Sequence, residues 1–381
     1  MLPRSFTFFA SRRDLSTNGS ALLQQINAAA EAMTAAFARP RTMRLTLPAI
    51  SLTQSEDLDV DLAMSSRWYA RGRAAGFRWV NQPFHLTGPT FGDFRYASQI
   101  IANLLSKHEG MFASINIRQP ENISDGAGLY AAICKSLSRK DYRGFANFRL
   151  GVGFNITDYT PFFPFSDGPQ SGVSVALESL PLIRREWERT HNLEEVAESL
   201  RAALGQAQDA FCGALTTSSL AYHGADWSLA PLPNGPESVV GLVEEISGNP
   251  VGGGGNLGTI ARLTRCLKTP AAQGIRPTGF NGVMLSVLED DVLASRFLHR
   301  AVSVNDLLLY SSVCGCGLDM VPIAGDTPEV AIGEYAFDTG HLAFRLDKPL
   351  GVRFLPISRL KAGQKTEFSH DFVCNSAVVS L

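Results

Sequence analysis

The sequence predicts an α/β protein with a substantial, partly parallel sheet. Segments with apolar residues at helical spacing alternate along the chain with short segments whose apolar runs or period-two patterns are typical of strands. Such alternation is typical of strand–helix–strand units, in which strands pair in parallel. No low-complexity linker and no internal repeat interrupts the pattern, so we expect a single domain over residues 1–381.

The first predicted element is a helix over 20–38, where alanines and larger apolar residues recur every three to four positions. Asn18 or Ser20 is placed to cap it. We expect an N-terminal helical extension over 1–40. The opening "MLPRSFTFFASRRDLS" has no acid before Asp14, which is a weak transit-peptide feature, and it lacks the apolar core of a secretory signal.

The rest of the chain continues the alternation. Further helices are predicted by 3.6-residue apolar spacing at about 57–75, 97–109, 128–140, 182–213, 237–246, 257–267 and 329–340. Strands are predicted at 42–50, 76–84, 111–118, 148–156, 283–288, 317–323 and 350–357. Between these elements, the Pro- and Gly-rich stretch 157–172 is interpreted as a long functional loop.

The net charge and the number of cysteines argue against several classes of protein. A net charge of −2 with scattered Lys and Arg argues against nucleic acid, because a phosphate-backbone binder carries a basic stripe. No apolar run reaches the roughly 20 residues that span a bilayer. The six cysteines are too sparse for a disulfide-stapled fold, so we expect reduced thiols and a cytoplasmic location. A small-molecule ligand is the expected partner, and a homodimer stays open.

The stretch "NPVGGGGNLGTIARLTRCL" at 249–267 contains the spacing G-x-G-x-x-G. The stretch before it is helical, and no acid follows until Glu289, so a dinucleotide site is not expected and NAD is not predicted. The N–H groups of a glycine-rich helix start can still bind a carboxylate or phosphate. An ordinary loop capped by Asn256 is an equal alternative. The residues expected at such an anion site are Gly254, Gly255, Asn256, Gly258 and Thr259.

Three other segments carry both a functional and a structural interpretation. Asp226 and Ser228 precede two prolines and either orient a ligand or satisfy the backbone of a turn. Phe163 belongs to an aromatic loop that forms either a pocket wall or core. Glu289 lies in an acidic helix start, where the helix dipole favours carboxylates regardless of function.

The stretch "SVCGCGLDMVPIAGDT" at 312–327 is the densest in reactive groups. No second cysteine pair and no nearby histidine accompanies Cys314 and Cys316, so a structural zinc site is not expected. The spacing also differs from the C-x-x-C of a thioredoxin-like centre. Cys314 is therefore either a nucleophile or acid/base, or one of two small buried apolar residues.

Together, "DWSLAP", "GGGGNLGTIARL", "GFNGVMLSVLEDD", "SVCGCGLDMVPIAGDT" and "KPLGVRFLPI" resemble domain-of-unknown-function family 711, also called uncharacterised protein family 0210. The resemblance covers most of residues 42–368. It implies the fold of the pyruvate formate-lyase and anaerobic ribonucleotide reductase superfamily, a ten-stranded α/β barrel of two five-stranded half-sheets with helices outside. The family motif usually has serine where this chain has Gly315-Cys316, so Cys314 is the more family-like thiol.

In glycyl radical enzymes of that superfamily, an active thiol sits inside the barrel and a radical glycine lies near the C-terminus. Here no glycine follows Gly363, so no glycyl radical is expected. The family supplies no reaction that can be transferred to this chain.

These patterns lead to two hypotheses. The first is an enzyme that acts on a small anionic metabolite inside the barrel, with Cys314 and Glu289 as reacting groups. Asp319 and Asp326 would orient the substrate or bind a divalent cation, although the sequence identifies no metal. Lys348 or Arg353 would provide the counter-charge. The second hypothesis is a non-catalytic metabolite-binding or regulatory protein, which needs only complementary shape and charge.

Overall fold

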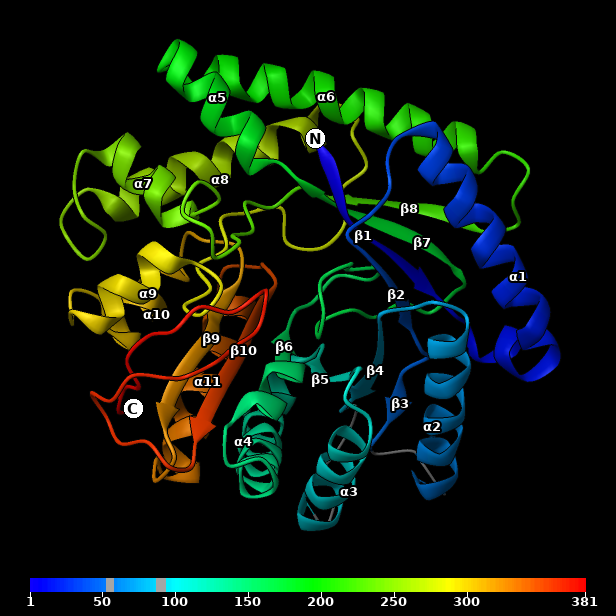
Figure 1. Cartoon of the computed structure of the whole chain (residues 1–381), viewed down its shortest axis with the longest axis horizontal. Coiled ribbons are helices and arrows are strands. Elements are labelled where there is room, and N and C mark those ends of the chain that lie inside the picture. Colours follow the sequence, from blue (N-terminus) through cyan, green and yellow to red (C-terminus); the bar gives the residue numbers. More distant parts are fainter. Residues whose placement is uncertain (53–57, 87–93) are drawn as a thin grey trace.

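The computed structural model of the protein describes residues 1–52, 58–86 and 94–381. In this part of the chain, eleven α-helices accompany a ten-stranded mixed sheet, so the predicted α/β class is confirmed (Figure 1). The strands at the two ends of the sheet, β8 and β9, do not pair with each other. The ladder of paired strands therefore does not close on itself, and the predicted closed barrel is not seen in the strand pairing.

Five neighbouring parallel strands form the centre of the sheet. In spatial order they are β1 (Leu2–Phe9), β2 (Thr42–Thr46), β4 (Trp79–His85), β5 (Met111–Ile117) and β6 (Leu150–Phe154). β7 (Gly172–Glu178) pairs antiparallel with β1, and β8 (Ala221–Asp226) pairs parallel with β7. At the other side, β10 (Leu350–Ile357) pairs antiparallel with β6 and parallel with β9 (Gly317–Ala324). The short β3 (Ile50–Ser51) pairs with β4.

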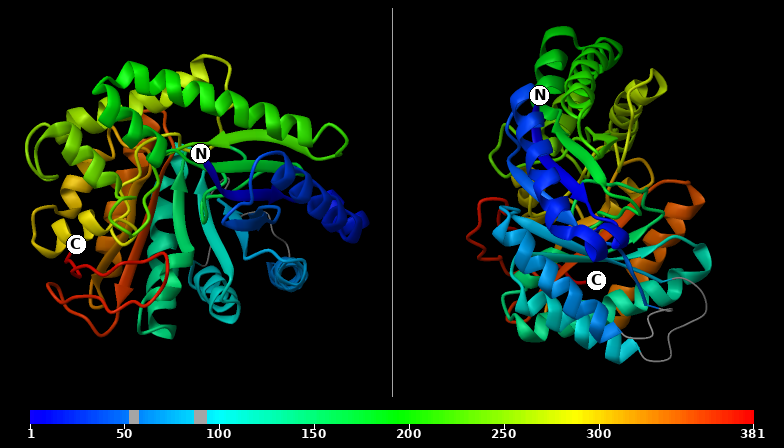
Figure 2. Two further views of the ribbon diagram at one scale, coloured as in Figure 1. Left: turned by 45° about the horizontal axis from the view of Figure 1, so that its top comes forward. Right: turned by 90° about the vertical axis from the view of Figure 1, so that its right-hand side faces the viewer.

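Helices lie around the outside of the curved sheet (Figures 1 and 2). Those packed directly on strands are α2 (Leu58–Ala74), α3 (Phe94–Lys107), α4 (Ile123–Lys140), α6 (Leu193–Ala214), α10 (Val304–Tyr310) and α11 (Glu329–Arg345). The helices α1 (Arg12–Ala36), α5 (Leu180–Thr190) and α8 (Asn256–Ala272) pack on α6, and α7 (Val239–Ser247) packs on α8 and α9 (Asp291–Leu298). Across the described ranges, no helix is both long and apolar enough to cross a bilayer.

The two faces of the central strands differ in polarity because side chains alternate along a strand. On β1, Phe6 and Phe8 point to the helix side, where Phe6 packs edge-on against Phe211 of α6. Thr7, between them, points to the inner face and donates to the carbonyl of Pro161. The loop after β6 thus runs across the inner face of the sheet, and it contains most of the loop predicted at 157–172.

Three predicted elements differ from the observed fold. Residues 2–9, assigned to the helical extension, form β1 at the centre of the sheet, because the buried Phe6 and Phe8 need a strand to reach the core. The single helix predicted over 182–213 is two helices, separated at His191, whose φ of 48° lies in the left-handed region. The segment 283–288 makes only isolated bridges. Residue 57 of the helix predicted at 57–75 lies outside the described residues.

Candidate functional site

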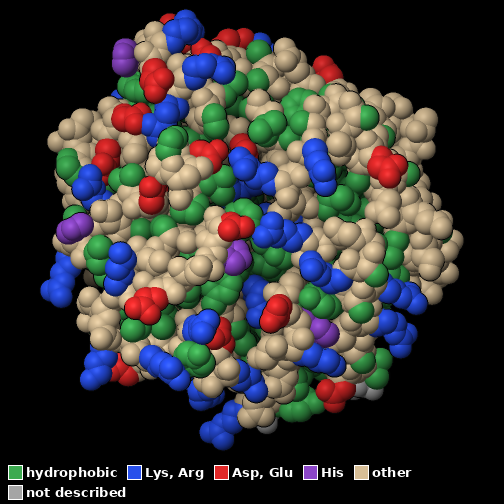
Figure 3. Space-filling view, viewed as in Figure 1, with side chains coloured by type: hydrophobic (Ala, Val, Ile, Leu, Met, Phe, Trp, Pro, Cys, Tyr) green, Lys and Arg blue, Asp and Glu red, His purple; other side chains and the backbone are tan. Residues whose placement is uncertain are grey.

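A pocket opens where the inner face of the sheet meets the loop after β6. The space that water can occupy inside it is about 60 Å³. The polar residues that line it are Arg4, Arg41, Thr42, Arg44, Glu289, Asp319 and Arg353, together with the thiol of Cys316. Figure 3 shows hydrophobic side chains near the middle of one face of the molecule, with basic and acidic side chains among them. The pocket therefore combines positive charge with apolar walls.

Arg44, on β2, is buried and has no carboxylate partner among the described residues. Its Nε donates to Thr42 Oγ1 at 3.0 Å, and one terminal nitrogen donates to the Pro161 carbonyl at 3.2 Å. The guanidinium lies 5.0 Å from the ring centroid of Trp79 and 5.4 Å from that of Phe163. Burial, and then the positive charge of Arg4, lower the pKa of Arg44 to about 9. A cation in this position is unfavourable until an anion joins it.

Arg4, on β1, adds a second guanidinium without a carboxylate within ion-pair distance in the described chain. It donates to the carbonyl oxygens of Ala230 and Pro231, at 3.2 and 2.9 Å. Burial lowers its pKa as well. Each guanidinium carries five N–H donors and these contacts use only some of them, so both arginines can still bind an anion.

The third arginine binds two acids at once. On β10, Arg353 donates from Nε and one terminal nitrogen to the two carboxylate oxygens of Asp319 on β9, the second bond measuring 2.7 Å. The same nitrogen lies 3.5 Å from Glu289. Burial would lower the pKa of Arg353, but the charges of Asp319 and Glu289 outweigh it and raise that pKa. Arg353 is thus a fixed cation whose charge the protein itself neutralises.

Glu289 lies close to both Arg353 and Asp319, and its pKa is raised. Burial raises its pKa, and the nearby charge of Asp319 acts in the same direction against the lowering effect of Arg353. A raised pKa is suited to a group that carries and releases a proton, which makes Glu289 a candidate acid/base group of the pocket.

The walls of the pocket are aromatic. They are formed by Trp79, Phe112, Phe148, Phe162, Phe163, Phe165, Phe280 and Phe372. The ring centroids of Phe163 and Phe112 are 5.5 Å apart. Those of Trp79 and Phe372, a residue of the C-terminal segment, are 5.8 Å apart. Such walls suit a ligand with a flat or apolar body.

Of the predicted site residues, the structure brings four into this pocket: Phe163, Glu289, Asp319 and Arg353. Cys316 lines it, whereas Cys314 lies just behind, buried to 1 % exposure. Lys348 donates to the carbonyls of Ser311 and Cys314, so it contacts the thiol segment rather than the pocket. Asp326, expected beside Asp319, is exposed beyond the other end of β9.

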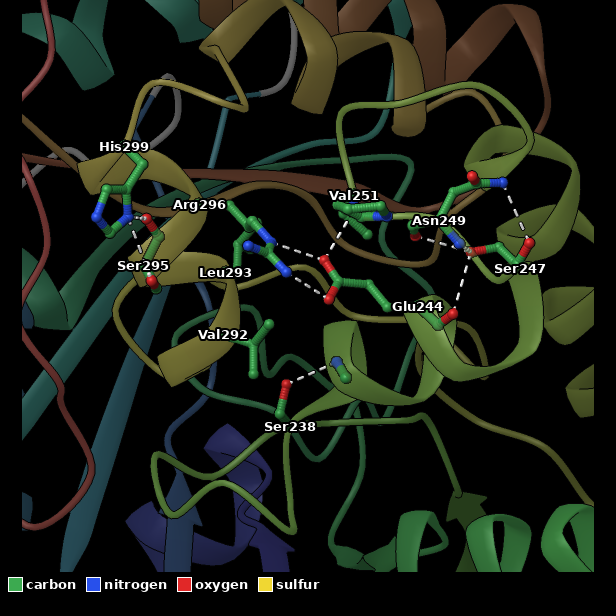
Figure 4. A network of polar contacts seen from close by, with 12 residues as sticks. Ser238, Glu244, Ser247, Asn249, Val251, Val292, Leu293, Ser295, Arg296 and His299 are labelled. Atoms are coloured by element: carbon green, nitrogen blue, oxygen red, sulfur yellow. Dashed lines mark hydrogen bonds and ion pairs between the residues drawn. The ribbon is translucent and has the colours of Figure 1, made fainter.

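The glycine loop lies outside the pocket. Gly254 and Gly255 are exposed, as is Gly258 in the first turn of α8, and the buried Asn256 side chain donates to the carbonyls of Pro250 and Gly253. Figure 4 shows how the loop is fixed: Glu244 accepts from the Val251 amide and from Nε and one terminal nitrogen of Arg296, each at 2.8 Å. The loop therefore does not enclose a space, contrary to what an anion site beside Thr259 required.

Asp226 and Ser228 have structural partners. Asp226 accepts from the amides of Ser228 and Phe280 at 2.8 and 2.7 Å, and from the Ser228 hydroxyl at 2.6 Å. Ser228 in turn accepts from the Gly282 amide. Burial raises the pKa of Asp226 despite these donors. The two side chains thus hold the segment after residue 278 against the end of β8. Of the two predicted roles, this is the structural one, in which they satisfy backbone N–H groups of a turn.

Arg4, Arg41, Arg44 and the aromatic residues of β4 and β5 were missed at the level of sequence. One signal was present: on β2, Thr42, Arg44 and Thr46 alternate with apolar residues, and β5 shows the same alternation at Ser114 and Asn116. A parallel strand that is covered by helices on both faces is apolar along its whole length. Polar residues at every second position therefore indicate that one face of the strand is not covered by helices.

Polar residues also occupy the other end of the inner face. Asp167 accepts from His85, from Asn116 at 3.2 Å and from Arg118 at 2.8 Å. Burial would raise the pKa of Asp167, but the bond from His85 and the charge of Arg118 outweigh it and hold that pKa well below its usual value. Because these contacts are all internal, this cluster anchors the loop after β6. Among the described residues, no group of three or more His, Cys, Asp or Glu is placed to hold a metal ion.

The fold and the site define an α/β protein with an arginine- and aromatic-lined pocket on the inner face of a mixed sheet. Its sequence matches the family model Uncharacterised ACR (DUF711) over residues 84–369, which is most of the chain. The chain therefore belongs to this family, as the sequence motifs predicted.

Curated relatives carry the name UPF0210 protein. The chain is 25% identical over 346 residues to the one from Limosilactobacillus fermentum, covering 85% of this chain and 76% of the relative. It is 26% identical over 283 residues to the one from Oenococcus oeni, covering 70% and 62%. For the Pyrobaculum arsenaticum protein the identity is 32% over 145 residues, covering 38% of this chain and only 32% of the relative. The similarity to that protein therefore concerns about a third of its length.

Proposed function

We propose that this protein is an enzyme that binds a small organic anion in the arginine-lined pocket and acts on it by polar acid–base chemistry. The observation that carries the proposal is the pair Arg4 and Arg44, two guanidinium groups that face one pocket without a carboxylate partner in the described chain. Burying an unpaired charge is costly, so its persistence is best explained by an anionic ligand.

The aromatic walls narrow the class of ligand. A free inorganic anion would use the arginines but leave the rings of Trp79 and Phe163 without a partner. A carboxylate or phosphate attached to a flat or apolar body would use both. Glu289 supplies the reacting group in this proposal, because it lines the pocket beside Arg353 and burial raises its pKa, which favours proton exchange with a bound ligand.

The enclosed fold implied by the superfamily resemblance is part of the proposal. Residues 277–287 form parallel bridges with both outer strands: Pro277 with Ala225 of β8, and Ser286 with Asp319 of β9. An irregular strand in this position supports a barrel interior that shields the pocket from bulk water. Non-catalytic binding is the second candidate, and the unpaired arginines favour it equally.

Titration calorimetry with inorganic phosphate, benzoate and phenyl phosphate tests the binding step. We expect the two aromatic anions to bind and inorganic phosphate to bind more weakly. Arg44→Gln should weaken the aromatic anions at least tenfold, which corresponds to about 1.4 kcal/mol. The matched control is Arg139→Gln, a change at an exposed position on α4. Equal affinities in the two variants would contradict the proposed site.

A second measurement separates an enzyme from a binder. Proton NMR in D₂O follows hydrogen exchange at the carbon next to the carboxylate of phenylacetate, an aromatic carboxylate that carries two hydrogens on that carbon. We expect wild-type protein to accelerate this exchange for a ligand it binds, and Glu289→Gln to abolish the acceleration while binding persists. Binding without exchange in the wild type would favour the non-catalytic alternative.

A further inference from the structure

A second cavity, here called the outer groove, lies on the other side of the aromatic wall of the pocket. It is bounded by the C-terminal ends of α3 and α4, by residues 141–149 and by the segment 357–370. The space that water can occupy inside it is about 960 Å³, a volume typical of small-molecule sites. Phe145 lines the outer groove and Phe148 lines the pocket, and their rings stack with centroids 5.2 Å apart. The two cavities are therefore separate, with these two rings between them.

Arg149 lines the outer groove and is only 8 % exposed. One of its terminal nitrogens donates to the carbonyl oxygens of Leu105, His108 and Met111, at 2.8, 2.8 and 3.0 Å. These bonds fix the guanidinium, and among the described residues its Nε and its other terminal nitrogen have no hydrogen-bond partner. Burial lowers the pKa of Arg149 to about 10. Like Arg44, it is a buried cation without an ion pair in the described chain, an unfavourable arrangement that a bound anion relieves.

Three exposed cations accompany Arg149 in the outer groove: Lys140, Arg143 and Arg359. The guanidinium carbons of Arg359 and Arg143 lie 3.9 and 5.7 Å from the ring centroid of Tyr142. A guanidinium that stacks on a ring keeps the N–H groups at its edge available. None of the three cations forms an ion pair with another described residue. The same ring thus holds two guanidinium groups beside one cavity.

The acids of the outer groove do not pair with these cations. Asp141 accepts from the backbone amides of Arg143 and Ala146, at 3.1 and 2.6 Å, so its carboxylate stabilises the turn after α4. Glu109 and Glu367 are exposed and form no ion pair within the described part of the chain. Cations that are distributed around one cavity without acidic partners suit a ligand with several anionic oxygens, because each guanidinium can bind two such oxygens.

We propose that the outer groove is a second anion-binding site and that it takes a polyphosphate group. Arg149 binds one phosphate group at the buried end of the groove, and Arg143 and Arg359 bind groups nearer the solvent. The inference goes beyond the proposed function and does not depend on it, since the outer groove and the pocket share no lining residue.

Titration calorimetry on the full chain with inorganic phosphate, inorganic triphosphate and ATP tests the site. We expect triphosphate to bind at least about tenfold more tightly than phosphate, and Arg359→Gln to weaken triphosphate roughly tenfold. The matched control is Arg265→Gln, which removes an exposed charge on α8 outside both cavities and should leave the affinity unchanged. An ATP affinity no higher than that of triphosphate supports a site for the phosphate chain alone, and a higher one supports a nucleotide site.

Arg149→Lys tests the buried end of the groove while the positive charge is kept. A lysine ammonium has three N–H donors, which is enough for the three backbone carbonyls but leaves none for a ligand. Triphosphate affinity should fall roughly tenfold, while the thermal unfolding midpoint stays near that of the wild type. If this variant does not fold, Arg359→Gln, a change at an exposed position, still decides the question.

Several results would overturn the assignment. Triphosphate that binds no more tightly than phosphate would remove the polyphosphate site. Equal weakening in Arg359→Gln and Arg265→Gln would mean that overall charge, rather than the outer groove, attracts the anion. Loss of triphosphate binding in Arg44→Gln would place the anion in the pocket instead. Benzoate affinity should be the same in Arg359→Gln as in the wild type. Absence of benzoate binding in the wild type, with triphosphate still bound, would count against the proposed function and leave the outer groove supported.

Discussion

Arg353 and Asp319 face each other from adjacent parallel strands, with two N–H groups of the guanidinium bound to the two oxygens of the carboxylate inside the pocket. Their side chains are 6 and 9 % exposed, so the pair is almost fully removed from water. A pair of this kind adds little net stability when intact, but loss of one partner leaves an uncompensated buried charge.

The first prediction follows from this relationship. Asp319→Asn should lower the free energy of unfolding by about 3 kcal/mol, because Glu289 alone is left to neutralise Arg353. Urea denaturation at pH 7 measures the change. The control is Glu198→Gln, which breaks an exposed pair with Arg201 on α6 and should leave the midpoint unchanged. A midpoint for Asp319→Asn equal to that of the wild type would show that the pair is not isolated from solvent.

The second prediction concerns Arg44, whose charge has no acidic partner in the described chain. Arg44→Met should stabilise the ligand-free protein by about 1 kcal/mol, because an apolar chain between Trp79 and Phe163 avoids burying a charge. The same variant should lose anion affinity, so stability and binding change in opposite directions. Thermal unfolding and calorimetry on one preparation test both.

Arg41→Met is the informative comparison for this second prediction. Arg41 lines the same pocket but forms ion pairs with Glu178 and Glu237. Its removal should therefore not stabilise the protein. Stabilisation by both variants would mean that general loss of positive charge, rather than the unpaired state of Arg44, is responsible.

How far the sequence predicts this molecule is best seen by comparing β2 with β1. For residues 42–46, period-two alternation indicates a strand, and the strand is found. Residues 2–9 have the same pattern in Phe6 and Phe8, but an arginine- and serine-containing start of a chain is easily interpreted as a targeting segment or extension. Their role depends on pairing with residues 42–46 and 172–178, which local sequence does not encode.

The functional site, too, depends on contacts between distant segments that the local sequence does not encode. Asp319, Glu289 and Arg353 are predictable as candidates because they belong to family motifs, but their meeting depends on parallel pairing of β9 with β10 and on the bridge between Ser286 and Asp319. The glycine loop has strong local features, and yet those features only fix its own backbone. Arg44 belongs to no motif, so only the sheet reveals that it is buried, with no acidic partner among the described residues.

The third prediction is a pH dependence of anion binding. The pKa of Arg44 is about 9 in the free protein, and a bound anion raises it because the anion favours the protonated form. Binding is therefore fully present below the free-state pKa, and it weakens as pH rises above about 9 toward the pKa of the complex. Calorimetry with phenyl phosphate, which stays dianionic over this range, should give a constant affinity from pH 7.5 to about 8.5 and a falling one above. In Arg44→Gln the decrease near pH 9 should disappear, and its persistence would assign the titration to another group.

The fourth prediction separates the pocket from the glycine loop. Gly252 has a φ of +102°, and an added Cβ would lie 2.1 Å from the carbonyl oxygen of Ala301, a backbone atom that cannot easily move. Gly252→Ala should therefore cost about 3 kcal/mol in the free energy of unfolding, from strain and overlap together. Gly254→Ala is the matched control two residues away, because nothing lies within 4 Å of its Cβ and its φ is unexceptional, so its stability should stay close to that of the wild type. Neither variant should change the affinity for phenyl phosphate at a temperature where it is folded. A tenfold loss of affinity in Gly254→Ala would move the anion site from Arg44 to the start of α8.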